Sequence, residues 1–93
     1  MTVMVDELRV WPHARGIFRA GSCHLTSTSL DELHVFAARL GLRREWFQDH
    51  RIAPHYDLVA SKRALALHYG AEFVTAREQC RRRRASAGSL VRC

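Results

Sequence analysis

The sequence lacks the features that would place it at once in a membrane, secretory or zinc-ribbon class. No apolar run approaches the roughly 20 residues that a membrane-spanning helix needs, so we expect no membrane partner. Residues 1–6 lack the basic start and long apolar stretch of a signal peptide, which predicts a cytoplasmic location. The three cysteines include no Cys-x-x-Cys pair, which argues against a structural zinc ribbon.

Sequence signatures of nucleotide binding and metalloproteolysis are also missing. The chain contains no Gly-x-x-x-x-Gly-Lys-Ser/Thr loop, no Gly-x-Gly-x-x-Gly and no His-Glu-x-x-His. No reaction can therefore be read from a motif, and the sequence does not decide whether the chain is an enzyme.

The length and charge of the chain predict its domain organisation and the charge of its partner. Its 93 residues predict a single small α/β domain over residues 1–80, followed by a basic, flexible tail over residues 81–93. Because so short a chain buries only a limited core, a homodimer is an open alternative. The net charge of +6 suggests an anionic partner. Five of the positive charges belong to arginines near the C-terminal end, which leaves +1 for the rest of the chain: Arg81, Arg82, Arg83, Arg84 and Arg92.

One helix is clearly marked. Ser29 and Glu32 form a Ser-x-x-Glu capping box, and apolar residues recur at helical spacing from Leu30 to Leu40. Gly41 follows where a helix ends. The other elements are a long loop over 7–28, strands over 2–5, 42–48 and 72–75, and helices over 59–69 and 76–84. This alternation predicts an α/β fold with a small three-stranded, mostly parallel sheet and two to three helices.

Polar residues gather at the expected ends of these elements. The run His55-Tyr56-Asp57-Leu58 precedes the second helix, which carries Lys62 and Arg63 in its first turn. Ligands of open parallel sheets bind beyond the carboxyl ends of the strands. The predicted topology places five polar residues at one such edge: Asp6, His24, Gln48, His55 and Asp57.

These residues suggest chemistry on a phosphate-containing ligand, a nucleotide or nucleic acid, with a divalent metal ion as cofactor. The hypothetical catalytic set is His55 as acid/base or metal ligand, with Asp57 and Asp6 as metal-binding or orienting carboxylates. The hypothetical ligand-binding set consists of His24, Gln48, Tyr56 and Arg63, of which Arg63 contacts phosphate. A weaker metal site would combine His24 and His34 with Asp57.

Each assignment has a structural alternative. Asp57 is equally well explained as a helix N-cap, Tyr56 as a core or rim aromatic, and His34 as a buried, hydrogen-bonded histidine. The alternative function is a non-catalytic nucleic-acid module that grips phosphates with Arg81–Arg84. A third is a protein-interaction module with Trp11, Trp46 and Phe47 on an exposed patch.

Several motifs also occur together in a known family. They are Val3-x-Val5-Asp6, His24-Leu25-Thr26, Glu32-Leu33-His34-x-Phe36-Ala37, Gly41-Leu42, Trp46-Phe47-Gln48, His55-Tyr56-Asp57-Leu58, Arg63 and Gly70-Ala71. From about residue 2 to 75 the chain resembles the bacterial and phage family called domain of unknown function 4031. The resemblance supplies no mechanism, but it implies that eight residues belong to the family pattern: Asp6, His24, His34, Gln48, His55, Tyr56, Asp57 and Arg63. The chain departs from that pattern at Met4, where an aromatic is expected, and in a short loop between Gln48 and His55.

Overall fold

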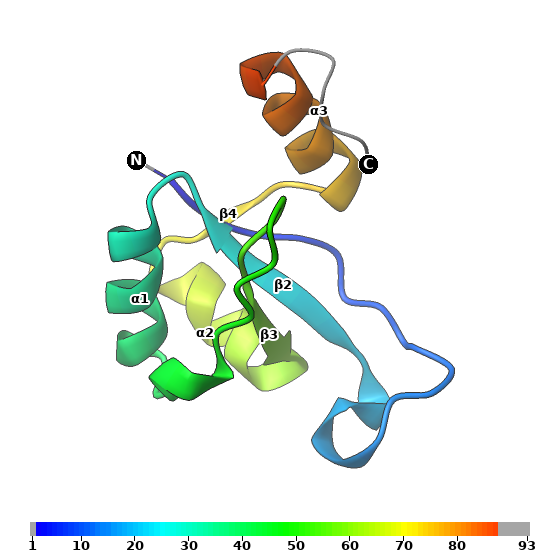
Figure 1. The fold of residues 1–93 in the computed structure, drawn as a ribbon. Coiled ribbons are helices and arrows are strands. Elements are labelled where there is room, and N and C mark those ends of the chain that lie inside the picture. Colours follow the sequence, from blue (N-terminus) through cyan, green and yellow to red (C-terminus); the bar gives the residue numbers. More distant parts are fainter. Residues whose placement is uncertain (1, 88–93) are drawn as a thin grey trace.

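A four-stranded mixed sheet organises residues 2–87, the part of the chain that the computed structural model describes (Figure 1). Its strands are β1 (Val3–Val5), β2 (Ser22–Ser27), β3 (Tyr56–Val59) and β4 (Glu72–Phe73). They lie in the order β3-β2-β1-β4. β2 runs antiparallel to both β1 and β3, and β4 runs parallel to β1.

The predicted three-stranded, mostly parallel sheet is therefore wrong in strand number and direction, although the α/β class is confirmed. β2 falls inside the predicted loop over 7–28. Its alternation of apolar Cys23 and Leu25 with polar His24 and Thr26 is a strand pattern, but it is short and surrounded by serine, threonine and glycine. The predicted strand over 42–48 is instead a short 3-10 helix, η2 (Arg44–Trp46), joined to one isolated bridge at Gln48.

Three α-helices accompany the sheet: α1 (Leu30–Arg39), α2 (Ala60–His68) and α3 (Ala76–Ala87). The Ser29 N-cap of α1 is confirmed, because the Glu32 backbone N–H donates to Ser29 Oγ at 3.4 Å, whereas the Ser29 N–H donates to Ser27 Oγ in place of the Glu32 side chain. Gly41, at φ 81°, closes α1 in a Schellman turn, in which the Leu42 N–H donates to the Ala37 carbonyl. A 3-10 helix, η1 (Gly16–Ala20), lies in the connection before β2.

The two faces of the sheet differ in what covers them. We call the first the helical face: Val5, Leu25 and Leu58 point into the core against α1 and α2, and all three are fully buried. We call the second the polar face, because it carries the alternate residues of the same strands, among them His24 and Asp57.

α3 covers part of the polar face. The buried Thr26 hydroxyl donates to Gln79 Oε1 at 2.7 Å, and Gln79 Nε2 donates to the Val74 carbonyl at 2.8 Å. At the start of the helix, the Ala76 N–H donates to a carboxylate oxygen of Glu7 at 2.6 Å. α3 is thus fastened to β1, β2 and the segments that follow β1 and β4.

The predicted basic tail begins within α3. Residues 81–87 continue this helix, and residues 88–93 lie outside the described part of the chain, so the flexibility of the tail stays a prediction. Across residues 2–87, the structure contains no helix long and apolar enough to cross a membrane.

Candidate metal centre

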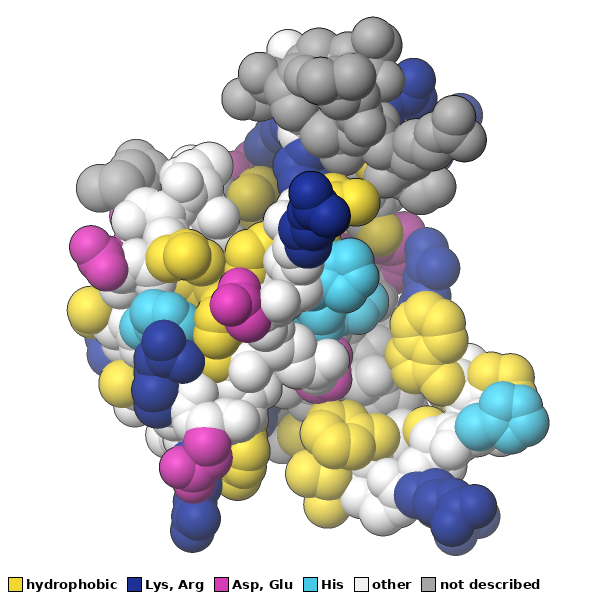
Figure 2. Space-filling model, in the orientation of Figure 1, with side chains coloured by type: hydrophobic (Ala, Val, Ile, Leu, Met, Phe, Trp, Pro, Cys, Tyr) yellow, Lys and Arg dark blue, Asp and Glu magenta, His cyan; other side chains and the backbone are white. Residues whose placement is uncertain are grey.

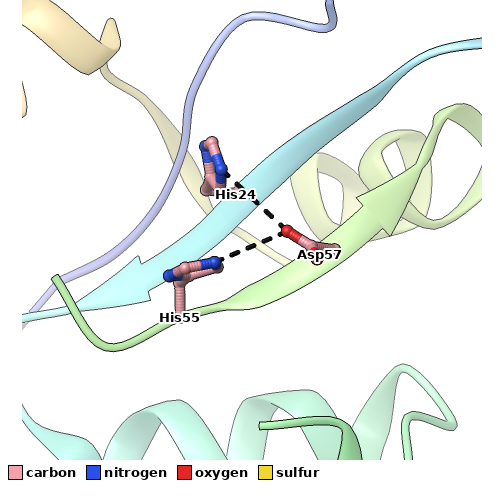
Figure 3. A group of neighbouring side chains, drawn as sticks. All are labelled: His24, His55 and Asp57. Carbon is pink, nitrogen blue, oxygen red and sulfur yellow. Dashed lines mark ion pairs between the residues drawn. The ribbon is translucent and has the colours of Figure 1, made fainter. Parts of the chain in front are cut away.

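Two histidines and one aspartate converge on the polar face. The antiparallel register of β2 and β3 pairs His24 with Asp57, so both side chains leave the sheet on the same side. His55 precedes Asp57 by two residues and therefore points to that side as well. Figure 3 shows both imidazole rings directed at the Asp57 carboxylate.

The distances among these groups suit a metal ion. Asp57 Oδ1 lies 3.5 Å from His55 Nε2 and 3.9 Å from His24 Nε2. One ligand atom from each residue can be chosen so that all three lie within 4.8 Å of one another. Ligand atoms held tetrahedrally at about 2.1 Å from a zinc ion are separated by roughly 3.4 Å. The three ligand atoms need to move only slightly closer together to reach that spacing.

Asp6 holds the His24 ring in the orientation that metal binding requires. This buried carboxylate follows β1, and it accepts the His24 backbone N–H at 2.7 Å through Oδ1. Its second oxygen lies 2.7 Å from His24 Nδ1. The hydrogen bond raises the pKa of His24, because the carboxylate stabilises the imidazolium. In the neutral ring the proton stays on Nδ1 beside Asp6, which leaves the Nε2 lone pair directed at Asp57.

His55 and Asp57 are oriented in the same way. His55 Nδ1 lies 2.7 Å from the Ala53 carbonyl, to which it donates in the neutral ring, and Nε2 is again left as the lone-pair donor. Gln48 Nε2 donates to Asp57 Oδ2, the oxygen that faces away from the histidines. Gln48 is itself fixed by paired backbone hydrogen bonds with His55, at 2.9 and 3.1 Å. Every potential ligand thus has an outer partner that fixes its orientation.

The donor set indicates which ions fit. Two imidazole nitrogens and one carboxylate oxygen suit divalent transition metals such as zinc, iron or manganese better than magnesium. The side chains of His24 and Asp57 are 37% and 34% exposed, so water or a ligand can reach the coordination positions that the protein leaves open. A centre with three protein ligands and open positions is the arrangement of catalytic rather than structural sites.

A pocket of about 190 Å³ lies next to the centre. It is lined by Asp6, His24, Thr26, His50, Ala53, His55, Ala76, Gln79 and Arg83. Arg83 Nε is buried and has no hydrogen-bond partner within the described residues. Burial lowers the pKa of Arg83, but a guanidinium stays charged in proteins. The pocket is therefore lined by a guanidinium whose Nε makes no hydrogen bond to any residue in the described part of the chain, beside the three candidate metal ligands.

The remaining arginines of the run have different surroundings. Arg81 donates two hydrogen bonds to the Glu78 carboxylate, at 2.8 and 2.7 Å, and Arg82 donates one at 3.3 Å. These contacts lower the pKa of Glu78 to about 2. Arg84 is exposed. The run Arg81–Arg84 is thus divided between two arginines paired with Glu78, the exposed Arg84, and Arg83, which lines the pocket; phosphate binding by this run stays a prediction.

Two residues of the predicted site lie elsewhere. Tyr56 is buried on the helical face, and its hydroxyl is hydrogen-bonded to His34 Nδ1 at 2.8 Å, so neither residue joins the candidate metal centre. His34 is hydrogen-bonded, as the structural alternative predicts, but it is half-buried rather than buried, and the site combining it with His24 and Asp57 does not form. α2 begins after Val59 without a side-chain cap, so Asp57 is not an N-cap.

The two cations in the first turn of α2 contact backbone rather than the pocket. Arg63 Nε donates to the Asp6 carbonyl at 3.0 Å, and its guanidinium lies over the ring of Phe73 at 5.3 Å. Lys62 Nζ donates to the Leu40 carbonyl at 2.6 Å. Arg63 therefore supports the segment that presents the Asp6 carboxylate to His24.

Comparison with known proteins gives a family and no activity. Residues 3–86 match a family model described as protein of unknown function, DUF4031. Neither the curated proteins nor the solved structures contain a significant match to the chain.

Proposed function

We propose that this chain, which belongs to the DUF4031 family of proteins of unknown function, is a metal-dependent hydrolase of phosphate esters. The observation that carries this proposal is the convergence of His24, His55 and Asp57, each oriented by an outer partner, beside Arg83, whose Nε has no hydrogen-bond partner among residues 2–87.

The protein groups have separate roles in this proposal. His24, His55 and Asp57 would hold a divalent ion, which would supply a Lewis acid and lower the pKa of a bound water toward neutrality. Asp6 keeps the proton of His24 on Nδ1, and Gln48 holds the Asp57 carboxylate in register with both rings. The Arg83 guanidinium binds a non-bridging phosphate oxygen of the ester.

The reaction consumes water and one phosphorus–oxygen bond. A water oxygen forms the new bond to phosphorus, and the ester oxygen leaves with the electron pair of the broken bond. The proton lost by the water ends on the leaving alcohol. No oxidant or reductant is involved.

Metal binding is tested first, without reference to activity. Zn²⁺ and Mn²⁺ are titrated into the wild-type protein and into Asp57→Asn, and the melting temperature is recorded. An ion at 100 times its dissociation constant stabilises the folded state by about 2.7 kcal/mol. We expect this stabilisation in the wild type and its loss in Asp57→Asn. Asp49→Asn is the matched control, because Asp49 is an exposed carboxylate outside the centre. Equal stabilisation of all three proteins would refute the metal centre.

Phosphate ester hydrolysis is then measured with bis(p-nitrophenyl) phosphate and p-nitrophenyl phosphate on the metal-loaded protein. Arg83→Gln is compared with Arg84→Gln, two neighbouring arginines of which only the first lines the pocket. We expect Arg83→Gln to weaken binding of the ester and Arg84→Gln to leave it unchanged. If instead Arg84→Gln and Arg81→Gln abolish salt-sensitive binding of nucleic acid while no ester is cleaved, the non-catalytic alternative is correct.

A further inference from the structure

A second pocket, of about 500 Å³, opens next to the metal centre and differs from the first in chemistry. Its walls are mostly apolar: Ile17 and Phe18 of η1, Leu42, Trp46 of η2, and Val59. We call it the aromatic pocket. Its volume lies in the range of small-molecule sites, whose walls are mainly hydrophobic with a few polar groups.

The aromatic pocket and the metal centre share a wall. Asp57 and Gln48 both line the aromatic pocket, and they are also joined by the hydrogen bond that orients the Asp57 carboxylate. Asp57 therefore separates the metal centre from the aromatic pocket, and a ligand bound to the ion can extend past Asp57 into that pocket.

Two of the apolar side chains of this pocket are open to solvent, and the other three are half-buried. Ile17 is 73% exposed and Trp46 is 52% exposed. Figure 2 shows hydrophobic side chains gathered in the lower part of the view, and histidine side chains reaching the surface near its centre. Exposed aromatic and aliphatic groups beside a cluster of ionisable groups suit a ligand with one flat apolar part and one anionic part.

We propose that the aromatic pocket receives the base of a nucleotide whose phosphate lies at the metal centre. The inference rests on the proposed function and names its substrate class. A purine or pyrimidine ring offers planar faces for Trp46 and Phe18. With the base in this pocket, the ribose and phosphate would pass Gln48 and Asp57 at the shared wall on their way to the ion.

The test compares three ligands that dissect the nucleotide: adenosine 5′-monophosphate, ribose 5-phosphate and adenosine. Each is titrated into the Zn²⁺-loaded protein by calorimetry, the two phosphates as phosphonate analogues that the proposed activity does not hydrolyse, and in parallel by fluorescence in a Trp11→Phe background, where Trp46 is the only tryptophan. We expect the monophosphate to bind about tenfold more tightly than ribose 5-phosphate, the size of a base-stacking contribution, and to change the Trp46 emission.

Two variants locate the effect. Ile17→Ser and Trp46→Ala change exposed side chains of the aromatic pocket, and both should lower the affinity for the monophosphate to that of ribose 5-phosphate. Val35→Ser is the matched control, since Val35 is 65% exposed on α1 and lies outside the pocket. Ribose 5-phosphate binding should be unchanged in all three.

The outcomes separate this inference from the function on which it rests. Equal affinities for the monophosphate and ribose 5-phosphate would overturn the base pocket and leave the phosphate site standing. Binding of adenosine that needs Trp46, without any metal-dependent phosphate binding, would overturn the proposed function and keep the pocket. Binding of a single-stranded oligonucleotide in place of all three ligands would overturn the assignment to a free nucleotide.

Discussion

The two faces of one sheet show how the same strands serve two purposes. On the helical face, Leu25 is completely buried among apolar side chains. On the polar face, its sequence neighbour His24 remains 37% exposed and contacts two carboxylates. Because strand side chains alternate, stability and chemistry fall on adjacent residues and can be changed separately. Substitutions on the helical face and on the polar face test this comparison separately.

The largest effect is expected from Leu25→Ala. Truncating a fully buried leucine in the central β2 should lower the free energy of unfolding by about 2–5 kcal/mol. Urea denaturation followed by circular dichroism measures the change. Val35→Ala, at an exposed position of α1, is the control and should change stability little. A loss below about 1 kcal/mol for Leu25→Ala would mean that the helical face is not the main source of stability.

On the polar face, Asp6→Asn should weaken metal binding while the fold persists. Loss of the carboxylate behind a metal-binding histidine typically lowers metal affinity about 10- to 100-fold. Calorimetric titration with Zn²⁺ measures the affinity, and Asp49→Asn provides a carboxylate control outside the centre. An unchanged affinity in Asp6→Asn would show that the Asp6–His24 pair serves only to hold β1 against β2.

The attachment of α3 to the polar face is tested by Thr26→Val. The substitution leaves the buried Gln79 carbonyl oxygen without its donor, so we expect a loss of about 1–3 kcal/mol. Gln79→Leu also removes the donor to the buried Val74 carbonyl, so the double variant Thr26→Val/Gln79→Leu should not regain wild-type stability, but it should lose less than the sum of the two single changes. If the double variant is less stable than the sum of the two single changes, the hydrogen bond is not what fixes α3.

The smallest effect concerns pH. Burial lowers the pKa of His34 from its ordinary value of 6.5, so the unfolded chain binds a proton that the folded chain resists. The contribution of His34 to stability is therefore complete above pH 6.5 and is lost as pH falls below that value. Subtracting the stability profile of His34→Gln from that of the wild type isolates this contribution. A difference that grows as the pH falls would contradict the assignment.

The sequence predicted the local elements better than their arrangement. Helix α1 and the strand at β1 are marked by capping and alternation, and both are confirmed. The topology depends on β2, whose short alternating pattern lies in a segment rich in serine and threonine. When β2 is missed, the predicted strands over 2–5, 42–48 and 72–75 are separated by helices. That order predicts a mostly parallel sheet, which is not the observed arrangement.

The polar cluster was predicted through that incorrect topology. The structure does bring His24, His55 and Asp57 together, but it does so through the antiparallel register of β2 and β3, in mid-strand rather than at carboxyl ends. Tyr56 was included because it lies between His55 and Asp57, although strand alternation turns it to the opposite face. The sequence did not show that Arg83 belongs to the pocket. The helical spacing of Arg83 from Ala76 and Gln79, which line the same pocket, could have indicated that Arg83 belongs to it.

The position of β1 has a consequence for how the chain acquires its structure. This three-residue strand lies between β2 and β4, and its parallel partner Phe73 occurs near the opposite end of the sequence from Val5. Pairing over such a sequence separation requires closure of most of the chain, which makes folding slow compared with proteins dominated by local contacts. During synthesis, Val5 can pair with Leu25 of β2 early, but it lacks its parallel partner until Phe73 has left the ribosome, so the four-stranded sheet is completed only after most of the chain has been made.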